Sequence, residues 1–208
     1  MRSKGVLLVI SGFAGTGKGT LVKSLLENYD NYALSVSATT RAPRKNEIEG
    51  VHYFYKTKEE FLEMIEHGEL VEYAEYVGNY YGTPRAYVEQ QLTKGKDVIL
   101  EIEIQGALKI KERFPDTLLL FLLPPDVDTL KARLEGRGTE TEEIIEQRLS
   151  RAVEEAEFIE KYDYLIVNDD LEKCVRETHA VIQSQRLQTG RNLEFLAEMK
   201  KGLEKFKK

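Results

Sequence analysis

The stretch VLLVISGFAGTGKGT, residues 6–20, decides the fold. Five of the six residues from Val6 to Ser11 are apolar, which predicts a β-strand buried on both faces. Three glycines and a lysine follow, and apolar residues then recur at the spacing of an amphipathic helix. A strand, a glycine-rich loop, a lysine and a helix in this order are typical of a phosphate-binding P-loop.

The residue types of this loop suit a nucleotide phosphate. Glycines let backbone N–H groups turn inward around phosphate oxygens without a Cβ clash, and the helix N-terminus adds further donors. Lys18 would bring a positive charge to the phosphates. Gly19 stands where the usual motif has a hydroxyl, so Thr20, one residue later, is the candidate for orienting Mg²⁺ or its waters. The alternative is a glycine-rich turn beside a solvated lysine.

Composition narrows the class of protein. The 208 residues suffice for one domain with insertions, and a single cysteine, Cys174, excludes a disulfide framework and a thiolate zinc cluster. The net charge of −6 argues against a protein that coats nucleic acid. The apolar run near the N-terminus is too short for a signal peptide, and no run is long enough to span a membrane. We expect a cytoplasmic protein that binds neither nucleic acid nor membrane.

Strands and helices alternate along most of the chain, which predicts an α/β fold with a parallel core sheet flanked by helices. Core strands are expected at residues 32–36, 97–104, 117–123 and 164–167. Two further helices are expected near the C-terminus, the last from about Leu193.

A tyrosine-rich block at residues 48–83 interrupts this alternation. It predicts short strands at 51–55 and 70–77, with a helix between them that starts at a Thr57–Glu60 capping box. Another helix is expected to start at Thr83-Pro84, with Thr83 as its N-cap and Pro84 in its first position. The block is predicted to form a small inserted α+β subdomain.

Six segments of the chain resemble, in order, the elements of the guanylate kinase family. They are GFAGTGKGT, SVSATTRAPRKNEIEGVHYF, ELVEYAEYVGNYYGTP, ILEIEIQGA, RLEGRGTET and IVNDDL. One such segment could arise by chance, but six in the same order are specific. The resemblance implies a P-loop NTPase fold, with an inserted GMP-binding subdomain and a lid. It also implies a Mg²⁺-dependent enzyme that transfers the γ-phosphoryl group of ATP to GMP, and to dGMP.

The resemblance also implies how the chain is divided. The guanylate kinase-like domain is expected at residues 4–187, with its core at 4–36, 96–135 and 152–187. The GMP-binding insertion is expected at about 37–95, the lid at about 136–151, and a C-terminal helical extension at 188–208. A monomer or a small homo-oligomer is expected.

On the donor side, the resemblance assigns catalysis to Lys18, Arg137 and Arg148. Phosphoryl transfer depends on positioning and charge stabilisation, and a lid that closes its arginines onto the phosphates also excludes water. Arg151 could equally form a surface ion pair with Glu154 or Glu155. The ATP-binding residues implied are Gly12, Phe13, Ala14, Gly15, Thr16, Gly17, Lys18, Gly19, Thr20, Arg133, Arg137, Asn168 and Asp169. For Asn168 and Asp169 the alternative is a helix cap.

On the acceptor side, two arginine forks, Arg41 and Arg44, can hold the phosphate of a mononucleotide by bidentate bonds. Glu72 is the family's reader of guanine, since one carboxylate can accept from both donors of the guanine edge. The GMP-binding residues implied are Ser37, Arg41, Arg44, Glu47, Tyr53, Glu72, Tyr81, Gly82, Thr83 and Glu103. Core packing is the alternative for the tyrosines.

Two acids, Glu101 and Glu103, alternate along the predicted strand 97–104, so both are expected on one sheet face above the crevice. The resemblance implies that Glu103 contacts GMP and that Glu101, with Thr20, orients water on Mg²⁺. The family usually has an aspartate in this pair. The alternative is a pairing of these acids with Lys109 or Lys111.

Two other classes of function stay open at this point. One is a non-catalytic guanylate-kinase-like binding module, which would lack a working P-loop or the lid arginines. The other is a kinase for a different nucleoside monophosphate.

Overall fold

A five-stranded parallel sheet forms the centre of the molecule, in the order β2-β7-β1-β8-β9. The computed structural model describes residues 4–44, 46–76, 78–136 and 141–207. The strands are β1 (Leu7–Gly12), β2 (Tyr32–Leu34), β7 (Asp97–Glu101), β8 (Leu118–Leu123) and β9 (Tyr164–Val167). The predicted α/β fold with a parallel sheet is confirmed.

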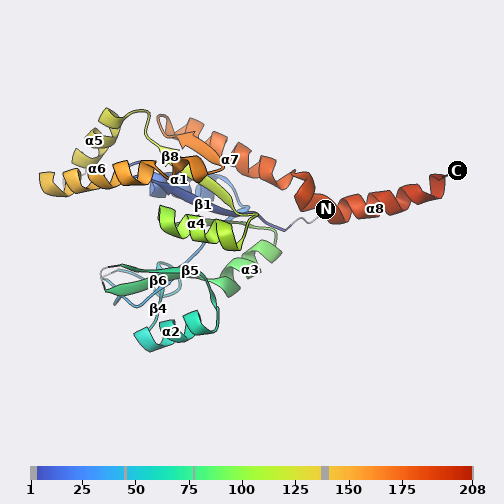
Figure 1. Cartoon of the computed structure of the whole chain (residues 1–208), viewed down its shortest axis with the longest axis horizontal. Coiled ribbons are helices and arrows are strands. Elements are labelled where there is room, and N and C mark those ends of the chain that lie inside the picture. Colours follow the sequence, from blue (N-terminus) through green and yellow to red (C-terminus); the bar gives the residue numbers. More distant parts are fainter. Residues whose placement is uncertain (1–3, 45, 77, 137–140, 208) are drawn as a thin grey trace.

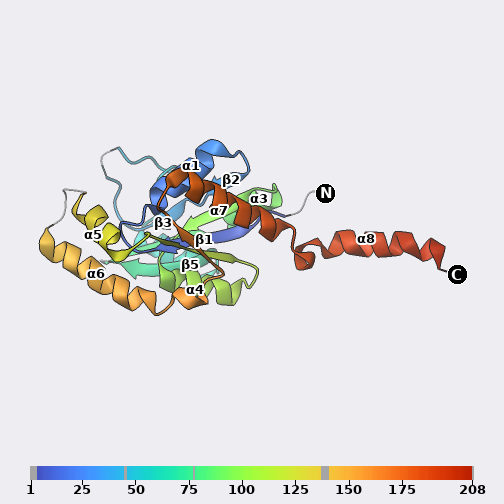
Figure 2. The ribbon, with the colours of Figure 1, turned by 90° about the horizontal axis from the view of Figure 1, so that it is seen from above.

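Helices cover both faces of this sheet (Figures 1 and 2). On one face, α1 (Lys18–Asn28) and α7 (Leu171–Arg186) pack against alternate residues of β1, Leu8 and Ile10. The opposite face is covered by α3 (Arg85–Thr93), α4 (Ile104–Arg113), α5 (Val127–Glu135) and α6 (Glu142–Ala156). Val9 points to that second core, so β1 is buried on both faces, as its sequence predicted.

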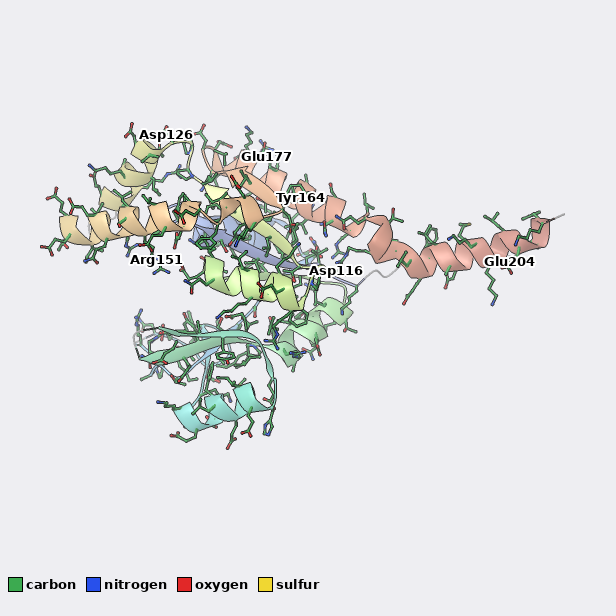
Figure 3. All side chains as sticks on the ribbon, in the orientation of Figure 1. Asp116, Asp126, Arg151, Tyr164, Glu177 and Glu204 are labelled. Carbon is green, nitrogen blue, oxygen red and sulfur yellow. The ribbon has the colours of Figure 1, made fainter. Side chains whose placement is uncertain are left out.

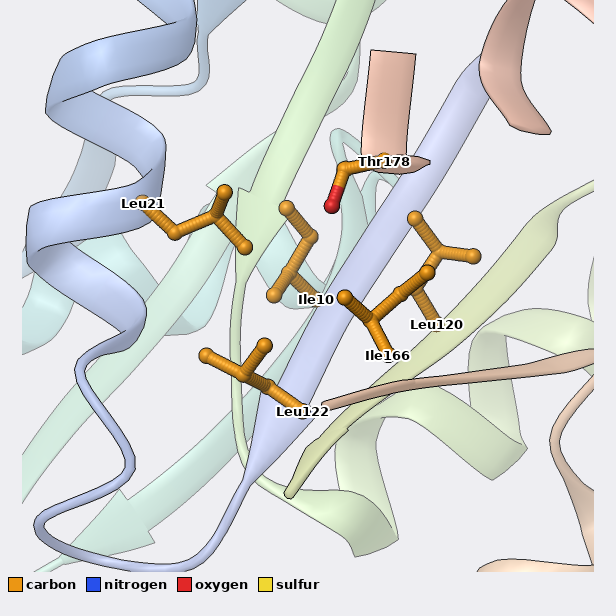
Figure 4. Close-up of a pocket in the computed structure, with 6 residues that line it drawn as sticks. All are labelled: Ile10, Leu21, Leu120, Leu122, Ile166 and Thr178. Carbon is orange, nitrogen blue, oxygen red and sulfur yellow. The ribbon is translucent and has the colours of Figure 1, made fainter. Parts of the chain in front are cut away.

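The core between β1, α1 and α7 is tightly packed (Figure 4). Side chains from these elements, β8 and β9 leave no space for a water molecule, as close packing of apolar groups requires. Thr178 is the one polar residue of this group, and its hydroxyl donates to the Cys174 carbonyl at 2.8 Å. The lining residues are Ile10, Leu21, Leu120, Leu122, Ile166 and Thr178.

A second sheet lies beside the first, in the order β4-β3-β6-β5 (Figure 1). Its strands are β3 (Ser37–Thr39), β4 (Tyr53–Tyr55), β5 (Leu70–Tyr76) and β6 (Asn79–Pro84). Helix α2 (Lys58–Glu66) packs Phe61 against this sheet, and the Thr57–Glu60 capping box is present at its start. An inserted α+β unit was predicted for this part of the chain.

Two predicted element boundaries are wrong. Strand β7 ends at Glu101 and Glu103 occupies the N-cap position of α4, so the two acids do not alternate along one strand. Thr83 lies within β6 and is not a helix cap, and Pro84 takes the N-cap position of α3 instead. The cause is strand pairing: Pro84 is still in register with Leu70 on β5.

A buried ion pair joins the N-terminal end of β7 to α7. Asp97 is fully buried and accepts from the Val6 backbone and Asn31 at 2.8 Å each, while Arg186 approaches its Oδ1 to 2.7 Å. Replacing Asp97 by alanine leaves Arg186 and two further donors without their acceptor. We expect a loss of about 3–5 kcal/mol in the free energy of unfolding, measured by urea denaturation.

Asp116→Ala is the matched control, because this aspartate is exposed. Its expected effect lies within about 0.5 kcal/mol. Equal losses in the two variants would contradict the role given to the buried pair.

The chain ends in η2 (Thr189–Asn192), α8 (Leu193–Leu203) and η3 (Glu204–Phe206). Both views show α8 projecting away from the body (Figures 1 and 2). The predicted start of the last helix near Leu193 is confirmed. In the described part of the chain, no helix combines the length and the apolar character that crossing a membrane requires.

Candidate active site

The glycine-rich loop between β1 and α1 has the backbone geometry that its glycines permit. Gly15 and Gly17 both have a φ of 90°, a value that residues with a Cβ rarely adopt. A Cβ on Gly17 would also lie 2.6 Å from Nδ2 of Asn168. Lys18 curls over the loop, and its Nζ donates to the carbonyls of Gly12 at 2.6 Å and Phe13 at 3.2 Å. The loop therefore holds the positively charged ammonium of Lys18 at the C-terminal end of β1.

Asn168, directly after β9, supports this loop. Its side chain is buried and donates to the Thr16 carbonyl at 2.8 Å, while the backbone carbonyl of Asn168 accepts from Nη2 of Arg133 at 2.9 Å. The alternative of a helix cap is wrong for Asn168 and Asp169. Asp170 caps α7, since its Oδ1 accepts from the Lys173 backbone at 2.7 Å.

Glu101 ends β7 close to the loop. Dehydration by the surrounding protein raises the pKa of its carboxyl, although the residue is partly open to solvent, and the charge of Lys18 acts in the opposite direction. Thr20 is exposed in the first turn of α1. Within the described ranges, no three His, Cys, Asp or Glu side chains gather to hold a metal ion.

Glu101 and Thr20 nevertheless fit Mg²⁺. This ion usually keeps several waters and binds through one or two carboxylates and the substrate's phosphates, without an all-protein cage.

Glu103 is joined to α6 by an ion pair that sequence reasoning missed. Its partner Arg151 projects from α6 (Figure 3). Oε2 of Glu103 lies 3.1 Å from Nη2 of Arg151, and Nε of the same arginine lies 3.0 Å from Glu155. The alternative of an Arg151–Glu155 pair is thus confirmed. Lys111, an alternative partner for the acids, instead pairs with Asp163 at 2.8 Å.

Two of the arginines predicted for the donor side, Arg133 and Arg148, lie on α5 and α6. Arg133 is on α5, and its Nη1 is buried with no hydrogen-bond partner among the described residues. Arg148 is half-buried on α6. Arg137, which sequence reasoning assigned to catalysis, lies outside the described residues.

The basic loop after β3 is tied together by one carboxylate. Glu47 lies 2.8 Å from Nη2 of Arg41, and it accepts from the Arg44 backbone at 2.6 Å and the Tyr55 hydroxyl at 2.8 Å. The hydrogen bond from Arg41 is the main reason that the pKa of Glu47 falls to about 2. The Arg41 guanidinium also stands 5.3 Å from the centre of the Tyr53 ring.

The aromatic residues predicted for this site lie together on β4 and β6. The rings of Tyr53 and Tyr81 are 6.1 Å apart, and Tyr53 is in register with Ser37 on β3. Tyr55, which sequence reasoning did not select, belongs to the same group through its bond to Glu47. The concentration of tyrosines in this segment was the available signal.

Glu72 on β5 is buried and pairs with Thr83 on β6, whose hydroxyl donates to its Oε1 at 2.8 Å. Burial raises the pKa of this carboxyl, while the Thr83 bond and the charge of Lys109 lower it. Its Oε2 faces Gly106 of α4, where an added Cβ would lie 3.5 Å away. Gly82 is equally close-packed, since a Cβ there would lie 2.9 Å from the Glu72 carbonyl oxygen.

The molecule thus carries a phosphate-type loop on one sheet, and a buried carboxylate and a basic loop on the other. The family model for guanylate kinase matches residues 4–185 of the chain. The chain belongs to the guanylate kinase family. A guanylate kinase of Halalkalibacterium halodurans is 52% identical over 193 residues, which cover 93% of this chain and 95% of the relative.

Other members of the guanylate kinase family are similarly close. One from Clostridioides difficile is 50% identical over 195 residues, covering 94% of this chain and 95% of the relative. The solved guanylate kinase of Anaplasma phagocytophilum is 37% identical, with a TM-score of 0.72 and coverage of 94% of this chain and 95% of that structure. The family match confirms the resemblance on which the sequence analysis relied.

Proposed function

We propose that this chain transfers the γ-phosphoryl group of ATP to GMP, giving ADP and GDP. Its place in the guanylate kinase family supports this activity. The observation that carries the proposal is the buried Glu72–Thr83 pair on a sheet separate from the Lys18 loop. A nucleoside monophosphate kinase needs a group that recognises the acceptor base and a cation for the donor's triphosphate. Glu72 and Lys18 are suited to these two roles.

On the acceptor side, we assign guanine recognition to Glu72, with Thr83, Ser37 and Gly82 around it. A guanine edge offers N1–H and N2–H₂ donors, and a carboxylate held by Thr83 keeps an oxygen available for them. Adenine offers an acceptor at that edge, which leaves the buried carboxylate without a donor. Glu103, near the start of α4, completes the assigned nucleoside contacts.

The acceptor phosphate is assigned to the basic loop and its tyrosines. Arg41 and Arg44 supply guanidinium groups, and Tyr53 and Tyr81 supply hydroxyl donors. Glu47 has a positioning role here, because its contacts with Arg41 and with the Arg44 backbone fix the loop.

On the donor side, we assign the ATP phosphates to residues 12–20 and Arg133, and the adenine side to Asn168 and Asp169. Lys18, Arg137 and Arg148 stabilise the charge that moves with the phosphoryl group, so no side chain acts as a nucleophile. Thr20 and Glu101 would hold Mg²⁺ through its waters, and the ion would supply positive charge to neutralise the phosphates.

The domain division follows the same assignments. We assign the kinase domain to residues 4–187, with an acceptor-binding insertion at about 37–95 and a lid at about 136–151. Residues 188–208 form the helical extension. We also infer a cytoplasmic enzyme that uses dGMP beside GMP, binds neither nucleic acid nor membrane, and exists as a monomer or a small homo-oligomer.

A panel of acceptors tests the proposed reaction. With ATP and Mg²⁺, we expect GMP and dGMP to release ADP in a coupled assay, and AMP and UMP to be poor acceptors. Equal use of AMP and GMP would contradict the specificity assigned to Glu72. Tight GMP binding without turnover would favour the non-catalytic binding module instead.

Arg41→Ala tests the phosphate assignment. A hydrogen bond to a charged group contributes about 1.5–3 kcal/mol, so we expect KM for GMP to rise roughly 10- to 10²-fold. KM for ATP should stay unchanged. Arg176→Ala is the control, because this arginine is exposed on α7 and pairs only loosely, at 3.6 Å, with Glu172. An unchanged KM for GMP in Arg41→Ala would remove Arg41 from the acceptor site.

A further inference from the structure

A groove at the opposite end of the central sheet from the Lys18 loop has no role in the proposed function. Its volume is about 600 Å³, and it lies beside η2 and the N-terminal ends of β1 and β8. Asp116, one of its lining residues, lies on the side of the body from which α8 projects (Figure 3). A strand rises about 3.3 Å per residue, so β1 holds the groove roughly 17 Å from the loop. Sites for small molecules typically have volumes of about 300–1,000 Å³, so the groove has the size of a separate binding site.

The walls of the groove carry more positive than negative charge. Nη2 of Arg191 donates to the Gly5 carbonyl at 2.7 Å, and Nη1 of Arg113 donates to the Val71 carbonyl at 3.1 Å. Each guanidinium has five N–H donors, so both arginines have further donors for a ligand. Among the described residues, neither arginine forms an ion pair with a carboxylate. Three cations and one carboxylate line the groove: Lys4, Arg113, Arg191 and Asp116.

The rest of the lining offers an apolar surface to a flat ring. Phe114 and Pro115 follow the end of α4, and Leu7 and Leu92 come from β1 and α3. The Arg85 guanidinium stands 5.6 Å from the centre of the Phe114 ring, which adds positive charge beside this apolar surface. An apolar wall with a few polar groups at one place is the usual composition of a small-molecule site.

One buried hydroxyl of the lining has no partner. Thr117 is 1% exposed, and its Oγ1 forms no hydrogen bond with any described residue. The backbone of the same residue is satisfied, since its N–H donates to the Phe114 carbonyl at 2.9 Å and its carbonyl accepts from Lys111 at 2.7 Å. Buried polar groups are usually hydrogen-bonded, and each exception calls for an explanation. An acceptor on a bound ligand would supply the missing partner.

We propose that this groove binds a phosphate monoester carried on a planar apolar ring. Such a phosphate has a charge of about −1.5 to −2 at pH 7, which matches the two positive charges by which the cations of the lining exceed Asp116. Its oxygens accept from the arginine guanidinium groups and from the Thr117 hydroxyl, while the ring packs on Phe114. An aromatic carboxylate has the same ring but only one negative charge, so it binds more weakly.

Calorimetric titration of the full chain with 1-naphthyl phosphate tests this site. ADP and GMP are present at saturation, so that the assigned active site is occupied. We expect one probe to bind per chain, and 1-naphthoate and inorganic phosphate each to bind about tenfold more weakly, because one lacks a charge and the other lacks the ring. Arg41→Ala and Lys18→Met should bind the probe as tightly as the parent chain. This result separates the groove from the active site, whether or not the proposed reaction is correct.

Thr117→Val is the most direct variant, because valine has nearly the shape of threonine and lacks only the hydroxyl. A buried hydroxyl without a partner does not stabilise the fold, so the melting temperature should stay the same or rise. The affinity for 1-naphthyl phosphate should fall roughly 10- to 10²-fold, the usual effect of losing a hydrogen bond to a charged group. Thr178→Val is the control, because this buried hydroxyl lies outside the groove and should not affect the probe.

Two substitutions of the charged lining should have opposite effects. Lys4→Gln should weaken binding of 1-naphthyl phosphate and Asp116→Ala should strengthen it, each by about threefold, because both residues are exposed. No binding to the parent chain, or equal affinity in Thr117→Val and the parent chain, would overturn the proposal. Loss of binding in Arg41→Ala or Lys18→Met would overturn it as well, since the probe would then occupy the active site.

Discussion

Replacing Lys18 by methionine is expected to lower kcat by about 10²- to 10³-fold, the usual cost of removing one preorganised donor that stabilises developing charge. Methionine keeps an unbranched side chain but cannot donate to phosphate oxygens as the Lys18 ammonium does. This ammonium lies over the loop and donates to the Gly12 and Phe13 carbonyls. The loss is measured as ADP release in the presence of saturating GMP.

Lys23→Met is the matched control for this experiment. Lys23 lies on the same helix but is exposed, with only a 3.8 Å contact to Glu27. Its kcat should equal that of the parent chain. GMP affinity, measured by calorimetry, should be unchanged in both variants. Near-normal turnover of Lys18→Met would show that the loop does not act on the transferred phosphate.

Replacing Glu72 by glutamine is expected to lower kcat/KM for GMP by about 10⁴-fold while leaving KM for ATP unchanged. Glutamine fills the same space and can still accept from Thr83. Its amide presents N–H donors where guanine also presents donors, so a buried hydrogen bond is lost and two donors face each other. Glu75→Gln, an exposed position on the same strand, is the control.

The pH dependence of the parent enzyme gives an independent check on Glu72. Burial raises the pKa of this carboxyl in the free protein, so it takes up a proton at a higher pH than an ordinary glutamate. A protonated Glu72 loses the acceptor that guanine needs, and kcat/KM for GMP should therefore fall as pH decreases through that raised pKa. The Glu72→Gln variant should lack this acidic limb. An identical limb in the variant would assign the titration to another group.

The core could be predicted because its local patterns agree with its tertiary surroundings. Five of the six residues from Val6 to Ser11 are apolar, and the strand they form is buried on both faces. The predicted strand at 164–167 and the Thr57 capping box are likewise confirmed, since both depend on residues adjacent in sequence.

The end of β7 shows where local pattern misleads. The alternation of Glu and Ile through residues 101–104 is typical of a strand, yet α4 begins at Ile104. The deciding contacts are those of Ile104, Ala107 and Ile110, which recur every three residues and are all buried in the same core. Extending the three-residue spacing of Ala107 and Ile110 back to Ile104 would have predicted the start of α4 correctly.

The polar contacts of the site were less accessible to sequence reasoning. The Glu103–Arg151 pair joins residues 48 positions apart, and the Asn168–Thr16 bond joins residues 152 positions apart. Such bonds depend on how helices and strands are stacked, which no local spacing encodes. Resemblance to the family supplied candidate residues here, but it did not supply their partners.

The bond from Asn168 to the Thr16 carbonyl has a consequence for nucleotide affinity. This bond fixes the phosphate loop through the Thr16 backbone, and Arg133 in turn donates to the backbone carbonyl of Asn168. Contacts within the protein therefore fix the shape of this loop. The entropy cost of ordering its backbone N–H groups is then part of folding and not of ATP binding. Losing the Asn168–Thr16 bond would weaken the affinity for ATP, although none of the loop groups assigned to the ATP phosphates is removed.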